Sequence, residues 1–443
     1  MIYVHYRESL DIRHDYRTIR SSYDGVIVCV LLAPRSHAVA KQVAPENVVG
    51  RDKLIGRIWK AIDQGSVVFT AERRIGKTTV LKKMQAESPP NKVVLYADLE
   101  KVDSPTRFVE VVLTDLKNYQ SKKAAIGRWL GGLVESIGGT EIGGVIKIPP
   151  QQKKGWQSIL EKILTDTCNH QTNQQIVFLW DEVPYMLQKI DALEEKSGST
   201  DNSSLAILDS LRAMRNENDN LRMIFTGSVG LHHVLRDLRG QDYASQPTND
   251  MEKVEIGPLA LEDAATLARN LLGQEAVTCD SQEPVIAKIV ELTDAVPFYI
   301  HRVVTRMTLL ESTVTPKDVE VLVQRQLVDD SDPWEMEHFR ERLKIYYRHN
   351  LPDADGNSIP AASLAGVLLD FLALAPSPRS IDQCYADLRS KVRIDNRDDV
   401  VQLLKSLAQD HYLVRDEKGR YRFRFPLVQR WWRTAQGLEG TKK

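Results

Sequence analysis

Ala71-Glu72-Arg73-Arg74-Ile75-Gly76-Lys77-Thr78-Thr79 is the stretch that decides the fold, and it stands between the apolar run Val67-Val68-Phe69 and a helical pattern. A strand that turns into a helix leaves backbone N–H groups unpaired at the helix start, and these donors bind phosphate with the help of the helix dipole. Gly76 lets the backbone approach the anion, Lys77 supplies a mobile charge for the β- and γ-phosphates, and the Thr78 hydroxyl is placed to ligate Mg²⁺. The stretch predicts a phosphate-binding loop, although Ala71 replaces the glycine that usually opens the pattern. The alternative is a basic loop that caps an ordinary helix.

A second motif lies about a hundred residues downstream. The apolar run at residues 176–180 (IVFLW) has the length of a buried parallel strand and ends in Asp181-Glu182. Asp181 at the strand tip is expected to hold Mg²⁺ through water, and Glu182 to polarise the water that attacks the γ-phosphate. This is a Walker B arrangement. The alternative is a pair of acidic residues that caps a helix.

A third candidate element follows the strand at residues 221–225, where the sequence reads Thr226-Gly227-Ser228. A hydroxyl at the tip of a neighbouring strand can sense the γ-phosphate or orient the attacking water, and Thr226 and Ser228 are equal candidates. The alternative is a turn that caps the next helix. Farther along, Arg236 and Arg239 are candidates for an arginine finger that reaches a neighbouring subunit's nucleotide, or are exposed helix arginines.

Length and charge narrow the class of protein. A chain of 443 residues is too long for one ordinary core, so two or three domains are expected. The 59 Lys and Arg residues balance the 60 Asp and Glu residues, so the formal net charge of −1 gives no overall attraction to nucleic acid or anionic lipid. The four scattered cysteines lack metal-ligand spacing and suit a reducing compartment. We expect a cytoplasmic protein with no membrane partner and no zinc or redox site.

The N-terminal region leaves localisation open to one alternative. Residues 25–33 (GVIVCVLLA) have the length of a signal-peptide core, Arg17 and Arg20 precede them, and Ala38-Val39-Ala40 resembles a cleavage site. The segment before this run is long and acidic for a signal peptide, and ATP chemistry belongs to the cytosol. We expect a buried strand or a start codon chosen too far upstream, with export as the alternative.

The remaining pattern divides the chain into regions. Apolar strands alternate with helical segments between residues 45 and 256, which predicts an α/β core with a parallel sheet and helices on both faces. A glycine-rich insert at about 124–150 includes a strand-forming run at 145–148, which suggests a hairpin that is either a surface excursion or an element that touches a partner or membrane. Residues 1–44 form an N-terminal extension.

Three further regions follow the core. Apolar residues at helical spacing between 257 and 330 predict a small helical bundle, the lid. Residues 331–362 hold a connecting helix at 334–347 and a polar linker at 352–360. Helices at 364–374, 381–388 and 398–407 then precede strands at 411–414 and 421–425, which predicts a winged helix at 363–443.

The order of these motifs resembles the archaeal-type ATPases, which belong to the STAND branch of AAA+-like proteins and are similar to origin-recognition ATPases. The resemblance covers roughly residues 45–435 and rests on Val49-Gly50-Arg51-Asp52, the loop at 71–79, Trp180-Asp181-Glu182, Thr226-Gly227-Ser228 and Val296-Pro297-Phe298-Tyr299. It implies an ASCE or AAA+-like P-loop core, a helical lid, a C-terminal winged helix, and ATP and Mg²⁺ as ligands.

The resemblance also assigns residues and marks departures. It implies that Val49 lines the nucleotide site and that Pro297 packs near the adenine in place of a sensor arginine. Asp294-Ala295 stands where such proteins often carry glycines. Together with Ala71, this departure bears on the rate of hydrolysis more than on nucleotide binding.

The winged-helix region gives a divided prediction for DNA. Its wing carries cations that could meet phosphates, whereas its recognition helix offers Asp398 and Asp399 with Lys405 as its only cation. DNA binding and a protein-docking role are therefore equal alternatives. The wing cations are Arg415, Lys418, Arg420, Arg422 and Arg424.

These patterns favour an ATP-dependent molecular switch that couples nucleotide state to a protein partner or to self-association through the lid and winged helix. The first alternative is a DNA-bound AAA+-like loader or regulator of transposition or replication. The second is a nucleotide-binding scaffold that hydrolyses little. For bacterial relatives of this type, the resemblance implies a defence or conflict system.

Overall fold

The computed structural model describes most of the chain after residue 42. The described residues are 22–23, 26–27, 43–120, 132, 134–135, 139–142, 144–149, 155–170, 173–199, 201–227, 230–239, 246–310, 312–353 and 355–438. The strand expected at residues 25–33 and Ser228 fall outside them, apart from Val26–Ile27 (β2), which pairs with Ser22–Tyr23 (β1). No helix among these residues is both long and apolar enough to cross a membrane.

A five-stranded parallel sheet in the order β4-β7-β8-β3-β9 forms the centre of the core. Its strands are β3 (Val67–Thr70), β4 (Lys92–Asp98), β7 (Gln175–Asp181), β8 (Leu221–Phe225) and β9 (Glu252–Glu255). In a parallel sheet all carboxyl ends lie at one edge, where ligands of α/β proteins bind. The order sets β3 beside β8 and β8 beside β7, so the phosphate-loop candidate and both strand-end motifs meet at that edge.

Alternating side chains divide the core into two layers of helices. Val94 faces α1 (Asp52–Gln64) and α2 (Lys77–Ala86), whereas its neighbours Val93 and Leu95 face the opposite layer. That layer holds α3 (Pro105–Gln120), α5 (Trp156–His170), α6 (Val183–Ser197), α7 (Ser203–Glu217) and α8 (Leu231–Arg239). This period-two burial is what a sheet covered on both faces requires. The predicted α/β class is confirmed.

Smaller elements complete the core. The turn η1 (Pro45–Asn47) precedes α1 and contacts α2. In the glycine-rich insert, β5 (Thr140–Ile142) pairs antiparallel with β6 (Val145–Lys147), and β6 packs on α3. The hairpin expected there is present, while most of the rest of the insert lies outside the described residues.

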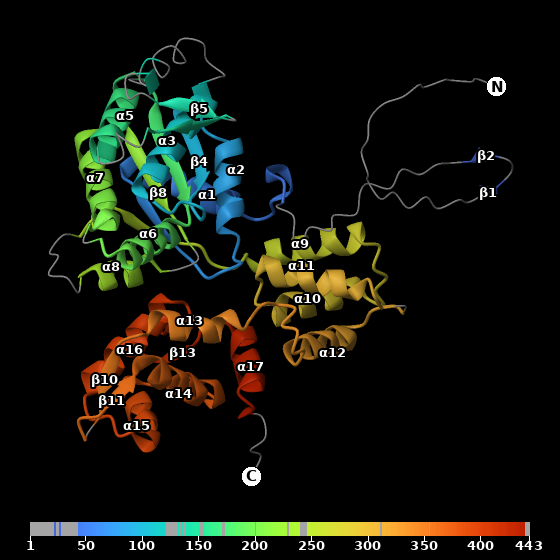
Figure 1. Cartoon of the computed structure of the whole chain (residues 1–443). Coiled ribbons are helices and arrows are strands. Elements are labelled where there is room, and N and C mark those ends of the chain that lie inside the picture. The colour runs from blue at the N-terminus through green and yellow to red at the C-terminus, as the bar shows by residue number, and fades with distance from the viewer. Residues whose placement is uncertain are drawn as a thin grey trace.

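The lid packs beside the core and is a bundle of helices, drawn in yellow and light orange in Figure 1. It contains α9 (Leu261–Gln274), α10 (Gln282–Leu292), α11 (Pro297–Met307) and α12 (Pro316–Leu327). Proline at the first position suits α11 and α12, because the missing N–H would have no partner there. Thr315 and Asp318 also form a capping box at the start of α12, which fixes where that helix begins.

Residues 331–438, named here the C-terminal module, lie against both the core and the lid (Figure 1). The module contains α13 (His338–Tyr346), β10 (Asn350–Pro352), β11 (Ser358–Pro360), α14 (Ala361–Leu374), α15 (Ile381–Lys391), α16 (Arg397–Gln409), β12 (Leu413–Arg415), β13 (Tyr421–Phe423) and α17 (Pro426–Ala435). The order of α14, α15, α16 and the β12–β13 hairpin is the order expected from the sequence. Trp432 packs near Phe423 of that hairpin, with ring centroids 6.3 Å apart.

Two expectations for this region need correction. The connecting helix starts at His338 rather than Trp334, because the Asp332 carboxylate accepts hydrogen bonds from the backbone N–H groups of Met336 and Glu337 and holds the preceding turn. The polar stretch at residues 352–360 is not a simple linker, because β10 and β11 pair antiparallel across it. Asp353 accepts from the backbone N–H of Asn357 and closes that hairpin.

The lid and the module share one continuous hydrophobic core. At their junction, Asp294 and Ala295 adopt left-handed φ angles of 51° and 54°. Glycine adopts such angles without steric cost, so it is common at positions of this kind. The Asp294 carboxylate accepts a hydrogen bond of 2.7 Å from the backbone N–H of Leu427 at the start of α17. The strained backbone therefore carries a side-chain contact that glycine could not make.

Candidate functional site

The loop after β3 has the backbone of a phosphate cradle. Gly76 has a φ of 99°, in the left-handed region, and α2 begins at the next residue. Ile75 is buried and packs into the core cluster that also contains α1 and α2. The loop is thus anchored by one apolar side chain, while the backbone beside it turns into the helix start.

Lys77 lies inside this loop. Its side chain is buried, and Nζ donates to the carbonyl oxygens of Glu72 and Ala71 at 3.1 and 3.3 Å. Burial lowers the pKa of the ammonium, while Glu72 and Glu182 oppose that shift. Phosphate oxygens can accept from this buried ammonium in place of the two carbonyl oxygens.

Thr78 and Asp181 meet as expected for a magnesium site. The Thr78 hydroxyl donates to Asp181 Oδ2 at 2.5 Å, although 103 residues separate them in the sequence. Burial raises the pKa of the Asp181 carboxyl to about 6, an effect that the Thr78 hydrogen bond partly offsets. One hydroxyl and one carboxylate beside the phosphate loop are the oxygen ligands that Mg²⁺ prefers, so these residues fit that ion.

Glu182 and Thr226 lie beside this pair. Glu182 has a left-handed φ of 59° and lines the cavity described below. Thr226 contacts the end of β7, because its N–H donates to the Trp180 carbonyl. Its buried hydroxyl has no hydrogen-bond partner among the described residues. A Cβ at Gly227 would lie 2.6 Å from Pro184, so this close approach requires glycine. Thr226 thus places at the tip of β8 a hydroxyl that makes no hydrogen bond with the described residues.

A cavity of about 730 Å³ opens over the loop. This volume lies in the range of small-molecule sites. The loop at residues 73–79 forms one end of the cavity, and Glu100, Glu182 and Tyr185 of the core line it beside the loop. The other walls come from three regions. Val48 and Val49 contribute from the segment after η1, Leu259, Leu267, Pro297, Phe298 and His301 from the lid, and His338, Arg342, Ile345 and Tyr346 from the module. The structure thus brings Val49 and Pro297 together with the loop.

Comparisons with known proteins show which fold the core has. Residues 61–235 match the family of AAA domains. The core has an AAA+-like P-loop fold. The Walker-type ATPase PABY2304 of Pyrococcus abyssi has a similar fold, with a TM-score of 0.56 and 15% sequence identity over 88% of this chain and 97% of that one. The similarity in fold therefore extends through the lid and the module.

Two other solved structures are less similar to this chain in fold and in sequence. The Aeropyrum pernix ORC2 protein, in ADPNP–ADP complexes, gives a TM-score of 0.47 with 10% identity over 90% of this chain and 96% of that one. A Thermotoga maritima RuvB mutant gives a TM-score of 0.36 with 9% identity over 85% of this chain and 94% of that one. No curated protein matches the sequence of this chain.

Arg51 ties the loop of the AAA+-like core to the lid. Its guanidinium donates to the carbonyl oxygens of Ile75 at 2.8 Å and Gly257 at 2.9 Å. Burial lowers the pKa of Arg51 to about 10, so the side chain keeps its charge at neutral pH. The side chain thus joins the phosphate loop to the segment that leads into α9.

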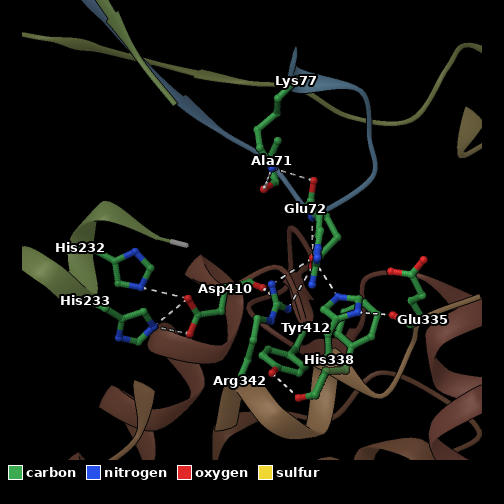
Figure 2. Close-up of polar contacts among 12 residues, drawn as sticks. Ala71, Glu72, Lys77, His232, His233, Glu335, His338, Arg342, Asp410 and Tyr412 are labelled. Carbon is green, nitrogen blue, oxygen red and sulfur yellow. Dashed lines mark hydrogen bonds and ion pairs between the residues drawn. The ribbon is translucent and has the colours of Figure 1, made fainter. Parts of the chain in front are cut away.

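Glu72 of the same loop contacts the module (Figure 2). Its Oε1 and Oε2 accept from the Arg342 guanidinium at 3.0 and 3.3 Å, and His338 Nε2 lies 3.8 Å away. Burial alone would raise the pKa of the Glu72 carboxyl, but Arg342 and His338 hold it well below its usual range. Arg74 also reaches the module, where it pairs with Glu335.

A second polar contact joins α8 of the core to the module. His233 Nε2 lies 2.7 Å from Asp410 Oδ2, and the Tyr347 hydroxyl donates to the same carboxylate at 2.6 Å. His232 Nε2 is 3.2 Å from Asp410 Oδ1 without hydrogen-bond geometry. Arg236 lies 2.9 Å from His233 Nδ1.

The two histidines and Asp410 are close enough to hold a metal ion, with ligand atoms within 4.8 Å of one another. A guanidinium can only donate, so Arg236 makes His233 Nδ1 an acceptor and leaves the ring proton on Nε2, facing Asp410. Metal ligation needs that nitrogen deprotonated, and the other ring nitrogen of a metal ligand normally donates. The arrangement is therefore that of a buried hydrogen-bond network between core and module.

The arginine-finger candidates have different outcomes. Arg236 donates to the Tyr346 carbonyl at 2.8 Å, so the structure gives it a partner in the module of its own chain. The reason is that the module packs against the helix on which Arg236 lies. The side chain of Arg239 is outside the described residues.

Two of the candidate DNA-contacting cations at the β12–β13 hairpin have acidic partners. Arg424 pairs with Glu255 at the edge strand β9, and Arg420 pairs with Asp416 at 2.8 Å. Arg415, Lys418 and Arg422 stay exposed. The hairpin whose cations could meet phosphates thus has one of its arginines turned to the AAA+-like core.

Residues that sequence reasoning missed share one property: their partners are distant in the chain. Arg342 and Glu72 are 270 positions apart, and His233 and Asp410 are 177 apart. No local period or motif links such pairs. One available signal was Glu72 itself, because a carboxylate in a loop that binds anions needs a cation nearby.

Proposed function

We propose that this chain is an ATP-binding and ATP-hydrolysing switch, with Mg²⁺ held by Thr78 and Asp181 and the lid and C-terminal module responding to the nucleotide. The hydrogen bond between Thr78 and Asp181 beside the buried Lys77 carries the proposal, because it brings two candidate Mg²⁺ ligands next to the candidate phosphate loop at one sheet edge. The match to the AAA domain family supports nucleotide binding.

The described residues suggest a role for each group. Lys77 would exchange its carbonyl partners for phosphate oxygens, and Glu182 would orient the attacking water. The free hydroxyl of Thr226 lies at the end of β8, where it could contact that water or the γ-phosphate. Bound Mg²⁺ would supply neutralisation of phosphate charge.

We favour coupling to a protein partner or a second copy over DNA binding. The first turn of the candidate recognition helix α16 carries Asp398 and Asp399, and its first residue, Arg397, pairs with Asp382. Arg420 and Arg424 of the hairpin also have acidic partners. Three exposed cations on the hairpin, Arg415, Lys418 and Arg422, keep a DNA-bound AAA+-like ATPase as the second candidate.

Steady-state ATP turnover and equilibrium ATP binding test this function. Lys77→Ala should lower turnover by about a hundredfold or more and weaken binding, whereas Lys53→Ala, an exposed lysine of α1, should behave as wild type. Glu182→Gln should bind ATP yet turn over very little. Unchanged turnover in Lys77→Ala would refute the site.

The same assay with duplex DNA at two salt concentrations separates the candidates. Turnover that is indifferent to DNA supports the protein-facing switch. Salt-sensitive stimulation by DNA supports the DNA-bound ATPase instead. Equal turnover by Glu182→Gln and wild type would favour a scaffold that hydrolyses little.

A further inference from the structure

A buried carboxylate in a phosphate-binding loop needs an explanation. The side chain of Glu72 is 6% exposed, and its Oε1 accepts a 2.7 Å hydrogen bond from the backbone N–H of Arg73. That N–H belongs to the loop whose amides would face the nucleotide. A negative charge at this position opposes the binding of a polyanion, unless a cation compensates it.

The compensating cation comes from the module. Arg342 on α13 meets both carboxylate oxygens of Glu72, whereas Lys77 Nζ contacts the Glu72 backbone carbonyl. Figure 2 shows this division, with Lys77 on one side of the loop and the Glu72 carboxylate directed to the module on the other. The loop and its counter-charge thus belong to different parts of the fold.

Arg342 is held in place by further contacts within the module. Its guanidinium also donates to the Asp410 carbonyl at 3.3 Å and lies 4.9 Å from the Tyr412 ring centroid. Arg342 also lines the cavity over the loop. The side chain is therefore positioned both to neutralise Glu72 and to add positive charge near the phosphate end.

We propose that Arg342 is a positioning residue that completes the phosphate-binding loop, so that the loop binds di- and triphosphates well only while the C-terminal module is docked. This inference rests on the proposed ATP site. When the module leaves, Glu72 becomes an unpaired negative charge next to the phosphates. The affinity should then fall more steeply the more phosphate groups the ligand carries.

Coupling between two equilibria is reciprocal. If docking raises ATP affinity by some factor, ATP raises the docking constant by the same factor. ATP is thus expected to hold the module against the core. A nucleotide with fewer phosphate groups should hold the module less tightly. A partner that binds the undocked module would therefore compete with ATP.

The experiment measures dissociation constants of adenosine, AMP, ADP and ATP for full-length variants in the presence of Mg²⁺. Arg342→Met should weaken ATP binding by about tenfold or more, ADP by less, and adenosine by no more than about twofold. The matched control is Arg340→Met, a partly exposed arginine of the same helix that pairs with Glu337 at 3.3 Å. It should leave all four constants unchanged.

Glu72→Gln provides the sign test. In this variant a neutral amide replaces the carboxylate while Arg342 is still present. ATP should therefore bind as tightly as it does to wild type, or more tightly. The double variant Glu72→Gln with Arg342→Met should recover most of the ATP affinity that Arg342→Met loses. Protease sensitivity of the segment between lid and module, with and without ATP, reports docking in each variant.

Two results would overturn the inference. One is an equal loss for adenosine and ATP in Arg342→Met, which indicates general damage to the cavity. The other is a similar loss of ATP affinity in both single variants, which indicates that the ion pair only holds the domains together. Should Lys77→Ala bind ATP like wild type, the ATP site itself would fail, a result that is distinct from both.

Discussion

The lid and the C-terminal module both border the cavity over the loop, but they do so with different chemistry. The lid presents mostly apolar side chains, among them Leu259, Leu267 and Pro297. The module presents charged and polar ones, including His338 and Arg342, and pairs with the loop itself. Apolar contact is non-directional and scales with area, whereas a buried ion pair depends on both partners being present. Under the proposed function, the lid would tune how tightly a base is held, while the module would decide whether the loop can bind phosphate.

The largest effect is expected from removing a charged group at the contact between the core and the module. Asp410→Ala removes the acceptor of His233 and Tyr347 and leaves both donors buried. We expect the free energy of unfolding to fall by about 3–5 kcal/mol, which is typical when one partner of a buried charged network is lost. Thermal unfolding monitored by circular dichroism measures this.

Asp382→Ala is the control for that experiment. Asp382 pairs with Arg397 on the exposed surface of the same module, where such pairs contribute little. Its unfolding transition should stay close to that of wild type. A similar shift in both variants would mean that the Asp410 network does not hold the module to the core.

A pH experiment sharpens the comparison at the contact between lid and module. Burial raises the pKa of Asp294 to about 6, and the Leu427 N–H opposes this only in part. The folded state thus takes up a proton between about pH 6 and 4 that the unfolded state does not, so the contribution of Asp294 to stability falls as pH rises through this window.

Asp294→Asn should remove this dependence, because the amide oxygen can still accept from Leu427. We expect the variant to be more stable than wild type by about 1–3 kcal/mol at pH 8 and equal to it at pH 4. Denaturation midpoints at several pH values measure the difference. An Asn variant that is less stable at pH 8 would contradict the assignment.

The smallest expected effect concerns the apolar side of the cavity. Val49→Ala removes part of an apolar wall and should weaken binding by about 1 kcal/mol, or roughly fivefold. The loss should be the same for AMP, ADP and ATP, because no charge changes. Titration calorimetry with the three nucleotides measures it, and a loss that grows with phosphate number would place Val49 at the wrong end of the cavity.

The sequence was most informative where chemistry is local. The glycine at the loop, Lys77, and the apolar strand before Asp181 are contiguous signals, and the α/β core followed from alternation of strand and helix patterns. Helix starts were less certain, because the side chain of Asp332 rather than an apolar period sets the start of α13. The contacts of Glu72 and Arg236 could not be predicted, since packing of the module decides them and hundreds of residues separate Glu72 from Arg342.

The ion pair between Glu72 and Arg342 also bears on how the protein can be divided. A fragment that stops after α12 contains the sheet, the phosphate loop and the lid, and it would look like a complete nucleotide-binding unit. It would nevertheless carry the Glu72 carboxylate without the Arg342 guanidinium that faces it in the full chain. Shortening this chain for expression therefore means changing residue 72 as well as choosing an end point.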